Sequence, residues 1–187
     1  MELDAYRQMA QLQETHWWFT ARRCILRAEL QRFALPSPSS THLLEIGCGP
    51  GGNLALLGEF GRVTAIEMND EARACAQQLG AALSPAVQCH AGHLPDGWPA
   101  AWTAQGQTPQ FDVVALLDVL EHIADDQAAL QALHGRVRPN GRVLVTVPAG
   151  PWMFGPHDVA HHHHRRYSAA QLKAVAQAAG WQVQRMS

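Results

Sequence analysis

A glycine-rich segment, Gly47-Cys48-Gly49-Pro50-Gly51-Gly52, follows a short apolar run at residues 42–46 and precedes a stretch typical of a helix. Glycine at such a junction permits positive φ angles and lets a ligand approach the backbone closely. A strand, a glycine loop and a helix in this order begin a parallel α/β sheet, which binds ligands at the carboxyl ends of its strands. The segment therefore predicts the class of fold and the edge of the sheet that carries the site.

The rest of the chain continues this alternation of strands and helices. We expect strands near residues 42–46, 62–67, 86–89, 111–117, 142–147 and 181–186, with helices between them. The pattern predicts an α/β, Rossmann-like, mostly parallel sheet with helices on both faces. The turn-rich segment 35–40 separates a predicted N-terminal helical appendage, residues 1–35, from a ligand-binding domain, residues 41–187.

Composition and charge exclude several classes of protein. The 187 residues suffice for one domain, and the formal net charge of −2 lacks the basic excess of proteins that bind nucleic acid. The N-terminus has no apolar signal core, and the apolar run at 113–120 is far shorter than the ~20 residues of a transmembrane helix. The four cysteines lack a C-x-x-C pair, so we expect free thiols and a cytoplasmic protein.

Two carboxylates flank the glycine loop and decide which ligand it suits. Glu67 lies 20 residues after Gly47, where a carboxylate can accept both hydroxyl groups of a ribose. Glycines 47, 49 and 52 also satisfy the dinucleotide pattern G-x-G-x-x-G, which is weak evidence by itself. Glu45, two residues before the loop, suits a cationic amino group and would repel a pyrophosphate. This favours S-adenosylmethionine (SAM) over a nicotinamide or flavin dinucleotide and over a ligand-free loop.

Further motifs resemble those of the class I SAM-dependent methyltransferases. The matching segments are Glu45 to Gly51, Ala65 to Met68, Phe111 to Val114, Leu117 to Ile123 and Arg138 to Arg142. The subgroup that these segments resemble most is methyltransferase type 11, the ubiquinone-biosynthesis type. His16-Trp17-Trp18-Phe19 and His163-His164-Arg165-Arg166-Tyr167 resemble a bacterial branch with His-Trp-Trp-Phe and His-x-Arg-Arg-Tyr motifs. The resemblance implies SAM as cofactor, with S-adenosylhomocysteine as its product.

The resemblance also implies which residues bind the cofactor. Glu45 orients the ammonium group, the loop lines the methionine part, Glu67 binds the ribose and Met68 packs on the adenine. Asp118 lies near the methionine part, or alternatively caps the helix that follows. His90 stands where the family often has an acidic residue, so backbone groups near Ala91 and Gly92, or His93, would read the adenine. The implied cofactor-binding residues are Glu45, Gly47, Cys48, Gly49, Gly51, Glu67, Met68, Ala91, Gly92 and Asp118.

Three side chains are candidates for catalysis: His122, His163 and Tyr167. His122 follows Glu121 directly after the fourth strand and serves either as a base or as a packed histidine. The four histidines at 161–164 are adjacent on a predicted loop and no second ligand pair is evident, so we predict no physiological metal site.

The residues that we expect to bind the acceptor are Arg165, Arg166 and Trp18. The two arginines and the tyrosine that follows them could clamp a carboxylate or phosphate of the acceptor. The alternative is that one arginine pairs with Asp158 or Glu121 and the tyrosine packs under the last helix. Trp18 contributes either to a substrate lid or to packing of its own helix.

Methyl transfer to a small-molecule or lipid- or sugar-linked acceptor is the predicted function. No N/D-P-P-Y/F sequence follows the fourth strand, which speaks against methylation of DNA bases. The alternative is a SAM-binding module or partner subunit without catalysis. The family sheet has seven strands in the order 3-2-1-4-5-7-6, and we expect this chain to end at the sixth. An unpaired sheet edge beside strand five predicts a homodimer through that edge.

Overall fold

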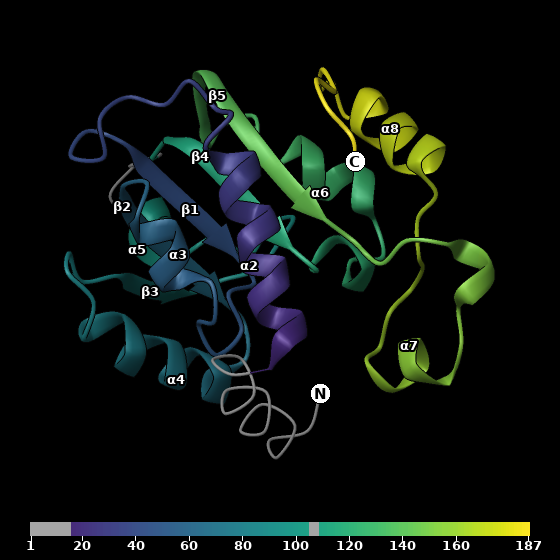
Figure 1. Ribbon diagram of the computed structural model, residues 1–187, viewed down its shortest axis with the longest axis horizontal. Helices are drawn as coiled ribbons and strands as arrows, with labels where there is room; N and C mark the ends of the chain where they lie inside the picture. Colours follow the sequence, from purple (N-terminus) through teal and green to yellow (C-terminus); the bar gives the residue numbers. More distant parts are fainter. Residues whose placement is uncertain (1–15, 105–108) are drawn as a thin grey trace.

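The structure is a computed structural model that describes residues 16–104 and 109–187 (Figure 1). Five strands form one sheet, and every neighbouring pair is parallel. The prediction of a parallel α/β sheet is therefore confirmed. The strands, in the spatial order β3-β2-β1-β4-β5, are β1 (His42–Ile46), β2 (Arg62–Glu67), β3 (Gln88–Ala91), β4 (Phe111–Leu117) and β5 (Val137–Thr146).

Helices cover both faces of this sheet, as expected. The described helices are α2 (Trp17–Leu30), α3 (Leu54–Gly58), α4 (Asp70–Ala81), α5 (Ala100–Ala104), α6 (Asp126–Gln131), α7 (Pro156–Ala160) and α8 (Ala169–Ala178), with short 3-10 turns η1 (Leu120–His122) and η2 (Pro151–Met153); all but α7 and η2 pack on the sheet. The first turn of α8 is closed by the expected capping box of Ser168 and Gln171. In described residues no helix is long and apolar enough to cross a bilayer.

Alternating side chains of the central strands build two cores. Leu43 of β1 and Val113 of β4 pack with α2, α3 and α4, whereas Leu44 and Val114 pack with α5, α6 and α8. Strands buried on both faces need apolar residues at nearly every position, which explains the continuous run Phe111–Leu117. Figure 1 shows α2 crossing one face of the sheet, while the segment with η2 and α7 projects beyond its edge.

The expected strand at 181–186 is wrong, because this segment lies outside the sheet and the described residues form five strands instead of six. Trp181 stacks on His134 with ring centroids 4.4 Å apart and donates from Nε1 to the Leu130 carbonyl. Arg185 then pairs with Glu29 of α2 at 2.8 Å. These contacts hold the tail against α6 and α2 instead of beside β5.

Strand β5 begins earlier than the sequence predicts. Arg138-Pro139-Asn140-Gly141 was expected to be a turn before a strand at 142–147, but β5 already starts at Val137. The pairing with β4 shifts register between Phe111 and Val113, and Asn140 has a φ angle of 65°. The turn residues therefore form a bulge within the strand.

Candidate functional site

The loop after β1 is held in conformations that favour glycine. Gly47, Gly49 and Gly51 have φ angles of 66°, 54° and 99°, all in the left-handed region. A Cβ atom on Gly47 would lie 2.7 Å from Cγ2 of Val119, whereas one on Gly49 would meet no atom within 4 Å. Packing therefore requires glycine at 47, and the open space beside Gly49 is where a ligand can approach the backbone.

Cys48 contributes to this loop through its backbone and through a weak contact of its thiol, which donates to the Gly49 carbonyl at 3.6 Å. Its side chain is buried in the core beneath the loop, with its sulfur 3.6 Å from that of Cys89 in β3. Its N–H and that of Gly47 both donate to the Ile66 carbonyl of β2. The side chain therefore supports the loop from below, and any contact of Cys48 with a ligand would come from its main chain.

Glu67 ends β2 beside the loop. Its Oε2 accepts a hydrogen bond from the N–H of Gly49 at 2.9 Å, and its Oε1 accepts one from the N–H of Asn69 at 2.8 Å. Met68 is 69% exposed next to this buried carboxylate. The residues predicted to bind ribose and adenine thus follow one another at the carboxyl end of β2.

Glu45 is a second buried carboxylate of the site, at the end of β1. Asn53 donates from Nδ2 to its Oε1 at 3.0 Å, while Oε2 has no hydrogen-bond partner among the described residues. Burial raises the pKa of Glu45 to about 7, although the Asn53 hydrogen bond and the charge of Arg22 act in the opposite direction. A buried oxygen without a partner is costly, and an ammonium group is its chemical complement. Glu45 therefore fits the amino group of SAM.

Asp118 occupies the turn after β4 with a φ angle of 59°. Its Oδ1 accepts from the Thr146 hydroxyl at 2.9 Å, and its Oδ2 pairs with Nη1 of Arg22 at 2.7 Å. Nη2 of Arg22 also donates to Thr146 at 2.8 Å. Arg22 and Thr146 were missed by the sequence reasoning, because no spacing shows that α2 crosses the ends of β4 and β5.

The loop after β3 places Ala91 and Gly92 beside Glu67, and the side chain of His93 beyond them is exposed. Ala91 pairs with Glu67 in the sheet, and the Gly92 N–H donates to the Glu67 carbonyl at 3.4 Å. The His90 ring lies edge-on to Trp102, 5.8 Å between centroids. His93 folds back on its own turn, where its N–H donates to the Gly97 carbonyl at 2.7 Å. Ala91, Gly92 and His93 therefore all stay predicted contacts of the adenine.

A second cluster lies after β4. Glu121, His122 and His163 each offer one oxygen or nitrogen atom that could bind a metal ion, and these three atoms all lie within 4.8 Å of one another. The two imidazole rings pack edge to face, with their centroids 4.6 Å apart. Glu121 is fully buried, and burial raises its pKa to about 8. His122 is exposed at its surface, but the partial desolvation of its ring, followed by the charges of His163 and His161, lowers its pKa to about 4. The fold therefore brings two of the predicted catalytic residues together.

The arginine pair is engaged by carboxylates of the chain itself. Nε of Arg166 contacts both oxygens of buried Asp158 at 2.8 and 2.9 Å, which holds the pKa of that carboxyl well below its usual range. Arg165 pairs with Asp126 at 2.6 Å. These contacts agree with the alternative role in packing rather than with an acceptor clamp.

Tyr167, the third catalytic candidate, lies beneath η1, with its hydroxyl 3.5 Å from the Leu120 carbonyl. It is buried, and its hydroxyl donates to Asp126 at 2.8 Å. Burial and this hydrogen bond raise its pKa above its usual range. The side chain packs with α6 and α8, as the alternative expected.

Trp18 lies on the first turn of α2 with 43% of its surface exposed. Its ring meets Phe19 edge to face at 5.0 Å, and the guanidinium of Arg22 lies 5.4 Å from its centroid. Arg22 also pairs with Asp118, so its side chain links Trp18 to the candidate cofactor site.

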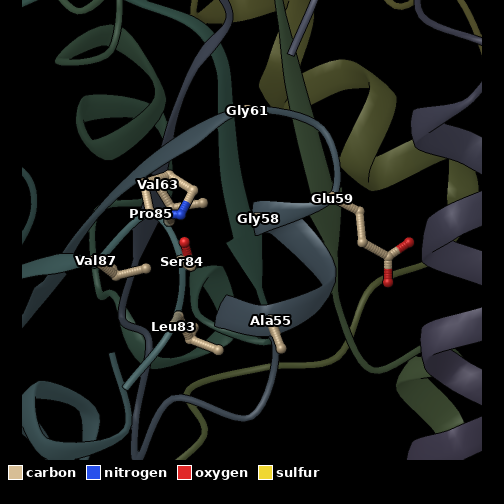
Figure 2. A pocket seen from close by; sticks show the side chains of 9 residues that line it. All are labelled: Ala55, Gly58, Glu59, Gly61, Val63, Leu83, Ser84, Pro85 and Val87. Carbon is tan, nitrogen blue, oxygen red and sulfur yellow. The ribbon is translucent and has the colours of Figure 1, made fainter. Parts of the chain in front are cut away.

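A cavity of about 230 Å³ lies at the opposite edge of the sheet (Figure 2). Gly61 and Val63 at the start of β2 line it, together with Ala55 of α3 and the segment 83–87 before β3. No residue predicted for the site contributes to it. The cavity is therefore separate from the carboxyl ends of the strands.

A parallel α/β sheet with a glycine loop after β1 and acidic residues at the ends of β1 and β2 defines a nucleotide-cofactor-binding domain. A family described as "Methyltransferase domain" matches residues 18–185. This chain therefore belongs to the class I SAM-dependent methyltransferases, as the motifs predicted.

Relatives support the same family. The ubiquinone biosynthesis O-methyltransferase of Aeromonas salmonicida is 30% identical over 170 residues, which cover 78% of this chain and 64% of that protein. The chain thus spans somewhat less than two thirds of this relative.

Solved structures share the fold. The methyltransferase in a complex with the Haloferax volcanii Trm112 activator superposes with a TM-score of 0.69 at 17% identity, covering 96% of this chain and 74% of that one. Haemonchus contortus phosphoethanolamine N-methyltransferase 2, solved with SAM, gives a TM-score of 0.62 at 21% identity over 82% of this chain and 35% of that one.

Proposed function

We propose that this chain transfers the methyl group of SAM to a small-molecule or lipid- or sugar-linked acceptor. The observation that carries the proposal is Glu45, a buried carboxylate with one oxygen unpartnered among the described residues beside the glycine loop. That oxygen needs a cationic partner, and SAM supplies an ammonium group. A dinucleotide would instead place negative phosphates next to it.

Each residue at the strand ends would bind a different part of the cofactor. Glu45 would hold the amino group, Glu67 the ribose and Met68 one face of the adenine. Asp118, held by Arg22 and Thr146, would lie near the methionine part. The remaining backbone contacts would come from Gly47, Cys48, Gly49, Gly51, Ala91 and Gly92. When bound, SAM supplies an activated methyl group on a sulfonium, so the protein mainly has to align the acceptor.

The acceptor's proton would be handled by the cluster after β4. His122 is neutral at pH 7 because its pKa is lowered to about 4, so its ring can accept a hydrogen bond or a metal ion. His163 donates from Nδ1 to Asp158 at 2.8 Å, which leaves its Nε2 free to accept. Tyr167 is bound to Asp126, and we assign it a structural role.

A hydroxyl group is the acceptor that we favour. The Aeromonas relative is named an O-methyltransferase, and the imidazole of His122 suits a group whose proton must leave. The test described next would also detect methylation of an amine or of a carbon atom, which we do not expect.

The test is a transfer assay with SAM labelled in its methyl group. The purified chain is incubated with a panel of phenols, catechols and bacterial lipid extracts, and S-adenosylhomocysteine and labelled product are measured together. We expect label in an acceptor fraction and its loss in Glu45→Gln. Tight S-adenosylhomocysteine binding without transfer to any fraction would instead support a non-catalytic SAM-binding module.

We also propose a homodimer in the cytoplasm. β5 ends the sheet and pairs with β4 alone among the described strands, and an unpaired edge promotes association. Cys24, Cys48, Cys75 and Cys89 are free thiols, as suits a reducing compartment. A mass of one chain by light scattering at high concentration would contradict the dimer.

A further inference from the structure

Glu121 is the buried acid that the proposed cofactor site leaves unexplained. It is 0% exposed, and neither of its carboxylate oxygens has a hydrogen-bond partner among the described residues. An unpartnered buried carboxylate is strongly disfavoured. The position therefore calls for a partner that residues 16–104 and 109–187 do not provide, and a cation would satisfy the ionised carboxylate.

Two imidazoles from different segments surround this carboxylate. His122 follows it on η1, and His163 comes from the loop after α7, some forty residues later. The backbone ties the segments together, because the His164 N–H donates to the Glu121 carbonyl at 2.8 Å. The cluster is therefore a product of the fold and not of one run of histidines.

His163 is held as metal-binding histidines usually are. Its Nδ1 lies 2.8 Å from Oδ1 of Asp158, whose side chain is fully buried and is fixed further by Arg166 and by the Gly155 N–H. A carboxylate behind the ring fixes its tautomer and makes the other nitrogen a better ligand. That nitrogen, Nε2, is left free for the cluster.

We propose that Glu121, His122 and His163 bind one divalent first-row transition-metal ion. Two imidazoles and one carboxylate form the ligand set of many catalytic zinc and iron sites. Metal–ligand bonds of about 2.0–2.1 Å require these atoms to approach more closely than their present spacing, within 4.8 Å. His122 is exposed and can make that adjustment by a side-chain rotation.

The surrounding charge suits a cation. Asp118 and Asp158 both act on Glu121 as negative charges, against one opposing charge from Arg22. Arg166 compensates Asp158, and the ring centroid of His161 lies 5.9 Å from that of His163. With Glu121 ionised, a divalent ion would neutralise the remaining acidic excess.

The site would activate a hydroxyl acceptor, an inference that rests on the proposed function. A metal ion here lowers the pKa of a hydroxyl group that it binds. The acceptor then releases its proton to water, its oxygen forms the bond to the methyl carbon, and sulfur keeps the electron pair of the broken carbon–sulfur bond. His122 and His163 would then act on the acceptor's proton through the metal ion that they bind rather than as bases.

The decisive experiment separates this site from the neighbouring histidine tract. Protein without a purification tag is stripped of metal, and Co²⁺ is titrated while its visible absorbance is recorded. The control variant His161→Ala/His162→Asn/His164→Ala leaves His163 as the single histidine of the tract. We expect one Co²⁺ per chain in the wild type and in this control, displaced by Zn²⁺.

Variants of the three proposed ligands should lose Co²⁺ binding, in contrast to the control variant. His122→Ala changes an exposed side chain and should fold, and Glu121→Gln keeps the buried shape. Each should weaken Co²⁺ binding by more than the about 10–100-fold expected for a residue that only supports a ligand. His163→Ala should do the same. If the control loses Co²⁺ while His122→Ala and Glu121→Gln retain it, the tract binds the metal and the proposed site is wrong.

The two proposals can fail independently. S-adenosylhomocysteine binding to metal-free protein tests the cofactor site alone, and Co²⁺ binding without S-adenosylhomocysteine tests the metal site alone. If the cofactor binds and Co²⁺ does not, the metal site is overturned and the proposed function stands.

Discussion

The backbone N–H of Gly49 donates a 2.9 Å hydrogen bond to Oε2 of Glu67, so the glycine loop after β1 is fastened to the end of β2. The carboxylate predicted to hold a ribose thus also sets the shape of the loop that would line the methionine part. One side chain therefore couples the two halves of the proposed cofactor site.

This coupling predicts a large effect at position 67. Glu67→Ala removes the acceptor for both backbone N–H groups and for the ribose, at roughly 1.5–3 kcal/mol for each charge-assisted hydrogen bond. Calorimetric titration with S-adenosylhomocysteine should show that loss of affinity. Glu67→Gln keeps one acceptor oxygen, so its affinity should lie between those of the wild type and Glu67→Ala. The exposed Glu71→Gln serves as the control. Unchanged affinity in Glu67→Ala would remove Glu67 from the site.

Two neighbouring glycines should respond differently to alanine. Gly47→Ala places a Cβ 2.7 Å from Val119, so we expect a stability loss of about 1–3 kcal/mol, partly recovered by adding Val119→Ala. Gly49→Ala meets no atom and should cost only the left-handed strain of about 1–2 kcal/mol, yet lose S-adenosylhomocysteine binding. Denaturant unfolding and calorimetry measure both. Intact binding in Gly49→Ala would mean that no ligand approaches there.

Ligand binding should depend on pH through Glu45. Its pKa of about 7 reflects burial first, opposed by Asn53 and Arg22 and reinforced by Glu67. The ionised fraction in the free protein rises from about one tenth at pH 6 to about nine tenths at pH 8. Since the ionised form attracts the ammonium group, S-adenosylhomocysteine affinity should rise by up to about tenfold relative to Glu45→Gln. Taking this ratio cancels titration of the ligand's own amine, and a flat ratio would contradict the role of Glu45.

Arg166 should prove structural. Arg166→Ala leaves the carboxylate of buried Asp158 without its main cation, so the melting temperature should fall by several degrees. Arg32→Ala, which breaks a longer and more exposed pair with Glu29 at 3.7 Å, should change it little. If Arg166→Ala keeps its melting temperature and its S-adenosylhomocysteine affinity but abolishes transfer, the acceptor-clamp hypothesis is right instead.

Strands with strong local signals could be predicted from the sequence, and those that depend on a partner could not. The apolar runs at 42–46, 62–67 and 111–117 match β1, β2 and β4 to the residue. The segment 181–186 has strand-like composition, but Trp181 and Arg185 find better contacts on α6 and α2. Whether a tail adds to a sheet is decided by tertiary contacts, which a local pattern does not contain.

The candidate site, too, could be predicted from the sequence only in part. Glycine spacing placed Glu45 and Glu67 beside one loop, because the topology of a parallel sheet makes that placement obligatory. The pairing of Arg22 with Asp118 and of His163 with Asp158 depends on how α2 and the loop after α7 fold across the strand ends. No periodicity in the sequence records those crossings, so these partners emerged only from the structure.

The central claim is tested most directly by calorimetric titration of the purified chain with S-adenosylhomocysteine, with NAD⁺ as the control ligand. We predict saturable binding of one S-adenosylhomocysteine per chain and no heat of binding from NAD⁺. Binding of NAD⁺ without binding of S-adenosylhomocysteine would contradict the assignment of the glycine loop, Glu45 and Glu67 to SAM.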